Sequence, residues 1–141
     1  MLVFQGHDPS KGETFYRPLG GGIEFGEPGI DALRREIREE LRVELGDVRY
    51  LGTLENLFVY DGRPGHEIVL VYEAMFADDA DYERRLEGQE SDGGRFEVLW
   101  KDINDFAVRG ERLYPSGLLE LMGVGVRSSQ GAGPADEGAT R

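Results

Sequence analysis

A glycine turn followed by a helix-forming run with grouped carboxylates constrains this chain more than any other feature. The run extends from Gly21 to Val43 and reads GGIEFGEPGIDALRREIREELRV. At about 100° per residue along a helix, its later glutamates fall within roughly a 100° arc beside an apolar stripe. Crowded carboxylates repel one another unless a cation lies among them, so the run predicts a divalent metal held against phosphate. The glutamates are Glu36, Glu39 and Glu40, and the stripe is Ile30, Leu33, Ile37 and Leu41.

Several residues of this run stand at a fixed spacing. They are Gly21, Glu27, Arg35, Glu36, Ile37, Glu39 and Glu40. This pattern resembles the Nudix box of the Nudix hydrolase superfamily, and so many constrained positions make it far more specific than a lone glycine motif. One position departs from the pattern. Arg42 stands where the family usually has glycine, before the expected aliphatic Val43, which leaves the end of the helix open.

The resemblance implies an α/β fold, a three-layer α/β/α sandwich around a mixed β-sheet, and hydrolysis of a nucleoside diphosphate linked to another group. By position it implies a metal set of Glu36, Glu39 and Glu40, with the Gly20 carbonyl as a further ligand. It also implies that Arg35 pairs with neighbouring carboxylates and holds them in position. Family members differ in which glutamate is the general base, so Glu36 is the leading candidate and Glu39 stays in the catalytic set.

The chemistry of such a reaction fits these residue types. Cleaving a phosphoanhydride at neutral pH requires a nucleophilic water and neutralisation of charge at phosphorus, and Mg²⁺ or Mn²⁺ bound by carboxylates supplies both. Hard oxygen ligands suit these ions better than zinc. The turn must bring backbone and metal together at the helix start, which makes Gly21 and Gly22 candidates for substrate binding. The competing interpretation is a solvated acidic helix face beside a flexible loop.

Residues outside the run are further candidates. Glu97 lies in the segment from Arg95 to Trp100, which is similar to a late family segment where a glutamate precedes a tryptophan and completes the metal site. An outward-facing strand position is an equal alternative, and Glu90 is a weaker alternative ligand. Arg17, just before the glycine turn, is a candidate for binding a substrate phosphate through its guanidinium. Its alternative role is a surface ion pair.

Aromatic residues also have two interpretations. Phe15, Tyr16, Phe58 and Tyr60 are candidates for stacking on a nucleobase, but aromatic residues at strand spacing are more often core residues. Trp100 is expected in the core, because large aromatic side chains are usually mostly buried.

Composition narrows the class of protein. The length of 141 residues suits one domain over residues 1–126. Residues 127–141 lack any apolar group worth burying and are expected to be a disordered tail. Without cysteine, signal peptide or membrane span, the expected location is the cytoplasm. The net charge of −12 argues against general nucleic-acid binding, so the expected partner is a small-molecule nucleotide bridged by metal.

The expected elements follow from apolar spacing, β-branched residues and turn residues. Asp78 to Gly94 is expected to be a functional or mobile loop. The other elements are a strand at Leu2 to Gln5, an extended stretch at Thr14 to Arg17, a helix at Pro28 to Leu41, a hairpin of Val48 to Tyr60 with His66 to Ala77, a strand at Arg95 to Trp100 and a helix within Gly117 to Met122.

The N-terminus fits the resemblance least well. Nudix domains usually carry a strand and a turn ahead of the segment that Leu2 to Gln5 matches, so that strand is either truncated or replaced by another segment. An unpaired sheet edge is a site for self-association, and weak homodimerisation is a hypothesis.

Functions from different classes fit the chain. The first is a metal-dependent Nudix pyrophosphohydrolase. The second is a catalytically silent Nudix domain that senses a nucleotide, against which the intact Glu36, Glu39 and Glu40 argue. The third is an acidic interaction module without a small-molecule site. Nothing in the run selects one nucleotide derivative as the substrate.

Overall fold

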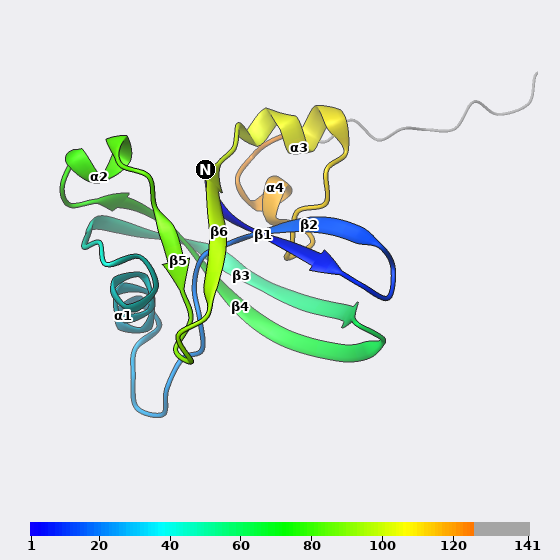
Figure 1. The fold of residues 1–141 in the computed structure, drawn as a ribbon, viewed down its shortest axis with the longest axis horizontal. Coiled ribbons are helices and arrows are strands. Elements are labelled where there is room, and N and C mark those ends of the chain that lie inside the picture. Colours follow the sequence, from blue (N-terminus) through cyan, green and yellow to red (C-terminus); the bar gives the residue numbers. More distant parts are fainter. Residues whose placement is uncertain (126–141) are drawn as a thin grey trace, which may run out of the picture.

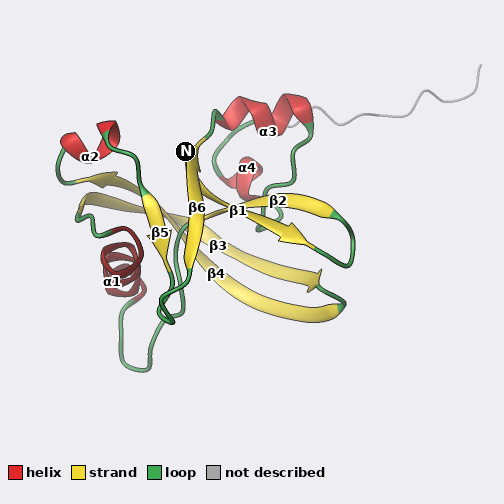
Figure 2. Cartoon of the chain, in the orientation of Figure 1, coloured by secondary structure: helices red, strands yellow, loops and turns green. Residues whose placement is uncertain are grey.

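The computed structural model describes residues 1–125, so the expected tail at 127–141 lies outside the described residues. Its strands form a four-stranded sheet of order β2-β1-β6-β5 and a separate two-stranded sheet of β3 and β4. Figure 1 and Figure 2 show the long β3–β4 hairpin crossing behind the four-stranded sheet. Helix α1 lies on one side of the strands, whereas α3 and α4 lie on the other (Figure 1). The α/β class expected from the sequence is confirmed.

Strand β1 (Leu2–Asp8) is internal to the four-stranded sheet. It pairs with β2 (Glu13–Pro18) on one side and with β6 (Arg95–Trp100) on the other, and β5 (Glu87–Gln89) completes the sheet beside β6. Within the described residues, the edges of this sheet are therefore β2 and β5. Weak homodimerisation stays a prediction, and light scattering at high protein concentration tests it.

Strands β3 (Leu45–Tyr60) and β4 (Arg63–Phe76) form the expected hairpin. Its turn is shorter than expected, because the register continues to the pair of Tyr60 and Arg63. Asp61 and Gly62 both have positive φ, 48° and 72°. Two-residue hairpin turns with this backbone match the twist of the flanking strands.

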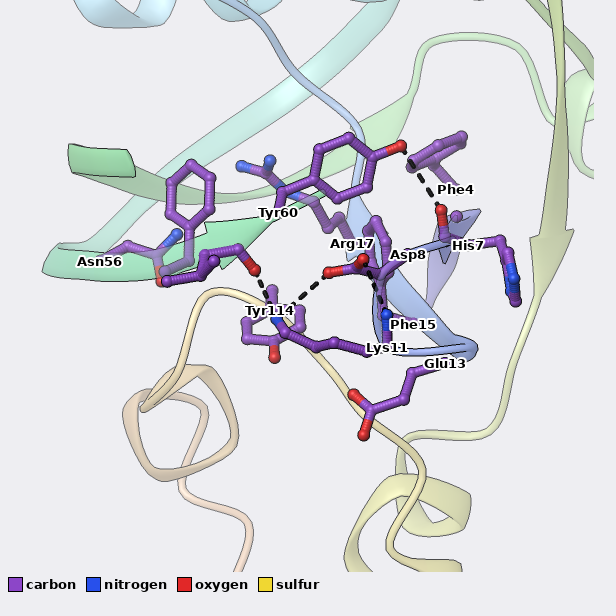
Figure 3. A pocket seen from close by; sticks show the side chains of 13 residues that line it. Phe4, His7, Asp8, Lys11, Glu13, Phe15, Arg17, Asn56, Tyr60 and Tyr114 are labelled. Carbon is purple, nitrogen blue, oxygen red and sulfur yellow. Dashed lines mark hydrogen bonds and ion pairs between the residues drawn. The ribbon is translucent and has the colours of Figure 1, made fainter. Parts of the chain in front are cut away.

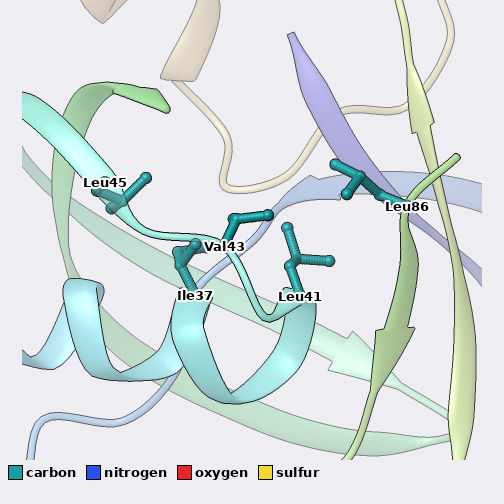
Figure 4. Close-up of a cluster of buried hydrophobic side chains, with 5 residues drawn as sticks. All are labelled: Ile37, Leu41, Val43, Leu45 and Leu86. Carbon is teal, nitrogen blue, oxygen red and sulfur yellow. The ribbon is translucent and has the colours of Figure 1, made fainter. Parts of the chain in front are cut away.

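Helix α1 (Gly29–Leu41) begins one residue later than expected, because Pro28 is its N-cap with an extended ψ of 145°. Its apolar stripe packs on the strand that follows and on the loop before β5, in a cluster shown in Figure 4. The buried residues of this cluster are Ile37, Leu41, Val43, Leu45 and Leu86. Glu36 and Glu40 lie beside this stripe and are partly buried, so burial of the stripe fixes where these glutamates point.

Three expectations about the fold were wrong. The strand pairings are antiparallel, and the one parallel contact among the described residues is the isolated bridge between Tyr16 and Leu113, so the sheet is not mixed in the expected sense. The segment Asp78 to Gly94, which was expected to be a loop, contains the short helix α2 (Ala80–Glu83) and strand β5. Trp100, which was expected in the core, is 48% exposed and stacks on Tyr82 at 5.7 Å between ring centroids.

The C-terminal part of the described chain contains α3 (Ile103–Arg109) and α4 (Leu118–Leu121). The segment between them lies against β2, where Tyr16 N–H donates to the Arg112 carbonyl at 2.8 Å and Tyr114 N–H donates to the Tyr16 carbonyl at 2.9 Å. No helix among the described residues has the length and apolar character that crossing a bilayer requires.

Candidate functional site

Arg35 organises the acidic face of α1 and the loop ahead of it. Its Nε and Nη2 donate to the two carboxylate oxygens of Glu27 at 2.9 and 3.0 Å. Its Nη1 donates to Glu36 at 2.9 Å and to Glu39 at 3.2 Å, and Nη2 also donates to the Gly22 carbonyl at 3.0 Å. One guanidinium therefore holds three carboxylates and the glycine turn together, which is the pairing expected for Arg35.

These hydrogen bonds shift the pKa values of Arg35 and Glu27 so that both groups favour their charged forms. The pKa of Arg35 is raised, first by its hydrogen bonds to Glu27 and then by those to Glu36. The pKa of Glu27 is lowered, chiefly by the hydrogen bonds from Arg35 and then by the one from the Glu24 N–H. Both groups are therefore held charged at neutral pH, and the loop carrying Glu27 is fixed to the helix.

Gly21 is needed because the Glu36 carboxylate packs directly on it. A Cβ placed on Gly21 would lie 2.2 Å from the Glu36 carboxyl carbon. Any larger residue would displace this carboxylate or the turn. The glycine that opens the motif therefore sets the position of a candidate base, and this contact gives its place in the sequence pattern a steric reason.

Glu40 lies in a different environment from its neighbours. It is half-buried, and its Oε2 has no hydrogen-bond partner among the described residues. The pKa of Glu40 is raised to about 7, first by burial and then by the nearby charges of Glu36, Glu90 and Glu39, in that order. Glu40 is thus a partly buried carboxyl group among like charges, which disfavour its ionised form.

This donor set fits a divalent cation in its chemistry. Converging carboxylates and an unpartnered buried oxygen are what Mg²⁺ or Mn²⁺ would satisfy. Across residues 1–125, however, no three acidic, histidine or cysteine side chains are gathered closely enough to hold an ion as they stand. Arg35 forms hydrogen bonds with Glu36 and Glu39, whereas the buried Oε2 of Glu40 has no hydrogen-bond partner among the described residues.

A cavity of about 640 Å³ lies beside Glu40. It brings the glycine turn, α1, β4 and the loop before β6 to one place. Its polar and glycine lining includes Arg17, Gly20, Gly21, Gly22, Glu40, Glu67 and Glu90. The turn and Glu40, both expected at the site, therefore face one space, whereas Glu36 and Glu39 do not line it.

Glu90, and not Glu97, is the late glutamate beside Glu40. Phe96 lines the cavity, and Val98 packs on the buried cluster under α1. Because side chains alternate along a strand, Glu97 points to the opposite face of β6, where it is exposed. Glu97 therefore lies away from Glu40, whereas its weaker alternative, Glu90, lines the cavity with Glu40. The identity of the late metal ligand stays a prediction.

Arg17 lines the cavity but already has an acidic partner. Its Nη2 donates to Glu67 Oε2 at 3.1 Å, and Asn56 Nδ2 donates to the same oxygen at 3.1 Å. Sequence reasoning missed this pair, because Glu67 and Asn56 lie on different strands from Arg17 and no spacing links them. Only the cross-strand pairing of Asn56 with Glu67 places them together.

Comparisons with known proteins agree with this fold and motif. The model of the NUDIX domain family matches residues 1–116, so the chain belongs to the Nudix family. Among solved structures, the chain is similar to the crystal structure of a MutT NUDIX hydrolase from Burkholderia pseudomallei. The two share 24% sequence identity over 73% of each chain, with a TM-score of 0.51. This similarity confirms the Nudix-type fold.

Proposed function

We propose that this chain is a metal-dependent hydrolase that cleaves a phosphoanhydride bond in a nucleoside diphosphate linked to another group. The observation that carries the proposal is the arrangement around Arg35 and Glu40. Arg35 holds Glu27, Glu36 and Glu39 against the glycine turn, while Glu40 keeps a buried, unpartnered oxygen on the same helix. A purely structural acidic helix has no need for a glutamate in that position.

Each residue has a role in this proposal. Glu36, Glu39 and Glu40 would hold Mg²⁺ or Mn²⁺, with the Gly20 carbonyl and Glu90 as further donors. When bound, the ion would supply charge neutralisation at phosphorus and lower the pKa of a bound water. Glu36 is proposed as the general base, because Gly21 and Arg35 fix its carboxylate.

The substrate would enter through the cavity beside Glu40. Arg17 uses only Nη2 in its pair with Glu67, so its remaining N–H groups are available for a phosphate oxygen. The Gly20 to Gly22 turn offers backbone without side chains along the same wall. The proposed partner is therefore a small-molecule nucleotide.

A screen of product release tests the proposal. The purified chain is incubated with sugar nucleotides, dinucleoside polyphosphates, nucleotide coenzymes and nucleoside triphosphates, with Mg²⁺ and then with Mn²⁺. We expect release of a nucleoside monophosphate from at least one compound, complete loss with EDTA, and loss in Glu39→Gln and Glu40→Gln with unchanged circular dichroism. Glu73→Gln is a matched control, because Glu73 forms an exposed ion pair with Arg49 on the hairpin.

The outcomes separate the alternatives. Turnover that survives in both variants would show that the metal set is wrong. Tight nucleotide binding with no turnover under either metal would favour the sensor. Calorimetry that detects neither divalent metal nor nucleotide binding would favour the acidic interaction module.

A further inference from the structure

A second cavity of about 290 Å³ adjoins the first. It lies between the β1–β2 hairpin and the far end of the β3–β4 hairpin (Figure 3). Phe4 and Arg17 line both cavities, so the two spaces meet at these side chains. A ligand with its phosphates beside Glu40 would have to pass Arg17 to place another group in the second cavity.

Aromatic rings form the walls of this second cavity. Phe15 is at their centre, with ring centroids 6.0 Å from Tyr60, 5.8 Å from Tyr114 and 6.3 Å from Phe4, all edge to face. Phe58 also lines the space. Tyr60 is 46% exposed, although it lies among other rings. Of the aromatic residues that the sequence left between core and stacking roles, three therefore line a cavity: Phe15, Phe58 and Tyr60.

The backbone leaves room for this wall. Gly6 lies opposite Phe15 in the β1–β2 register, and a Cβ on Gly6 would come 2.3 Å from the tip of the Phe15 ring. Glycine at this position lets the ring lie flat over the neighbouring strand. A larger residue at position 6 would force the ring to move.

The charges of the lining are already neutralised by partners. Asp8 pairs with Lys11 at 3.1 Å, Glu13 with Arg112 at 2.9 Å and Arg17 with Glu67 at 3.1 Å. Every Asp, Glu, Lys and Arg that lines the cavity thus has an opposite charge beside it. An anionic phosphate gains little in such a space, whereas a neutral planar group gains ring contacts on several sides.

One buried polar atom of the lining lacks a partner. Asn56 is 2% exposed, and its amide NH₂ donates to Glu67, whose carboxylate can only accept. The orientation of the amide is therefore fixed, and its Oδ1 has no hydrogen-bond partner among the described residues. An N–H donor on a ligand ring is the chemistry that would satisfy this oxygen.

We propose that the aromatic cavity is the binding site for the nucleobase of the substrate, with Arg17 at the boundary between base and phosphates. The inference rests on the proposed function for the phosphate half of the ligand. It adds that the ring-bearing half supplies recognition through stacking on the Phe15, Tyr60 and Tyr114 wall and through an N–H donor directed at Asn56. A sugar-phosphate group without a base would leave this wall unfilled.

Calorimetric binding without metal tests this inference directly. The wild-type chain in EDTA is titrated with the 5′-monophosphates of adenosine, guanosine, cytidine and uridine, and with ribose 5-phosphate. At least one nucleotide is expected to bind at least about tenfold more tightly than ribose 5-phosphate, given the usual contribution of base stacking. Equal binding of ribose 5-phosphate and all four nucleotides would overturn the proposal.

Variants locate the site. Tyr60→Ala is expected to weaken nucleotide binding at least about fivefold, and Gly6→Ala to weaken it by displacing the Phe15 ring. Tyr60→Leu, which keeps apolar bulk without the ring, serves if the alanine variant loses its fold. Tyr50→Ala is the matched control, because Tyr50 lies on the same strand, is 54% exposed and lines neither cavity. Wild-type affinity in both folded Tyr60 variants would overturn the proposal.

The two proposals fail in different ways. Because binding is measured without metal, tight nucleotide binding with no turnover in the screen would leave the base site standing and remove the hydrolase. Turnover with equal affinity for nucleotides and ribose 5-phosphate would keep the hydrolase and remove the base site.

Discussion

Both carboxylate oxygens of Glu27 accept hydrogen bonds from Arg35, from Nε at 2.9 Å and from Nη2 at 3.0 Å. This two-point contact joins the loop after the glycine turn to the helix that carries the glutamates of the proposed metal site. Only a guanidinium presents two parallel donors to one carboxylate. The same side chain then reaches Glu36 and Glu39. Arg35 is thus a positioning residue for the glutamates, in addition to any direct role in the reaction.

Arg35→Lys is expected to lower kcat by about 10- to 100-fold, because a lysine ammonium cannot hold Glu27 at two points while also reaching Glu36. The measurement is steady-state turnover with saturating Mg²⁺ on the compound found in the screen. Arg38→Lys is the matched control, since Arg38 lies on the same helix and makes a comparable two-point contact with the exposed Glu44, which follows the helix. Equal losses in both variants would contradict the role given to Arg35.

Glu40→Gln is expected to stabilise the metal-free protein while abolishing its stabilisation by Mg²⁺. The pKa of Glu40 is raised from its ordinary value of 4.5 to about 7 in the fold, so this group destabilises the fold progressively as pH rises from 4.5 to about 7. The gain in the variant is on the order of 1 kcal/mol after allowance for partial exposure, or roughly 3 °C in Tm.

Thermal melts at pH 5 and pH 8 check this expectation. In EDTA, the difference in Tm between variant and wild type should be larger at pH 8, where the wild-type carboxyl is ionised. Added Mg²⁺ should raise the Tm of the wild type alone. A variant less stable than the wild type at pH 8 without metal would contradict the destabilising effect assigned to ionised Glu40.

Glu90→Gln is expected to weaken binding of Mn²⁺ about tenfold or more, whereas Glu97→Gln should leave it within about twofold. Both residues are glutamates, so only their positions differ. Glu90 lies near enough to Glu40 for its charge to raise the pKa of Glu40, whereas Glu97 lies on the other face of β6. Calorimetric titration of Mn²⁺ into each metal-free variant distinguishes them. The reverse order of effects would restore Glu97 as the late ligand.

Local patterns predicted the main elements of the fold well. The bounds of α1 and β6 follow from helical spacing and from strand alternation, which are properties of short segments. Strand β5 escaped prediction because its three residues owe their conformation to pairing with β6. Helix α3 was missed despite local signals, since Asp102 caps Asn104 N–H and Gly110 ends the helix with positive φ.

The residues of the candidate site also divide into those that one local motif predicts and those that depend on the packing of distant segments. The roles expected of Gly21 and Arg35 rest on residues within one motif, and the structure brings these residues into contact. The choice between Glu90 and Glu97 depends on which face of β6 packs on α1, and a single strand pattern cannot specify that. The aromatic cavity depends on three separate hairpin and loop segments, so the sequence left its rings between core and stacking roles.

Arg42→Gly is expected to stabilise the protein by about 0.5–1 kcal/mol. Arg42 ends α1 with φ 57° and ψ 38°, a left-handed conformation that disfavours any residue with a Cβ. Its N–H donates to the Arg38 carbonyl at 3.0 Å, a bond that glycine keeps. The side chain makes only an exposed hydrogen bond to Gln89 at 3.2 Å, so its loss costs little. The departure from the family pattern therefore preserves the helix end at some cost in backbone strain.

Urea unfolding of Arg42→Gly and Arg42→Ala separates backbone strain from charge. Alanine retains the Cβ and should give no gain, whereas glycine should raise the unfolding midpoint with an unchanged slope. Equal stabilisation by both substitutions would mean that removal of the arginine charge, and not relief of the left-handed backbone, is responsible. Because the substitution leaves the glutamates of the proposed metal site on α1 unchanged, Arg42→Gly should keep wild-type affinity for Mn²⁺.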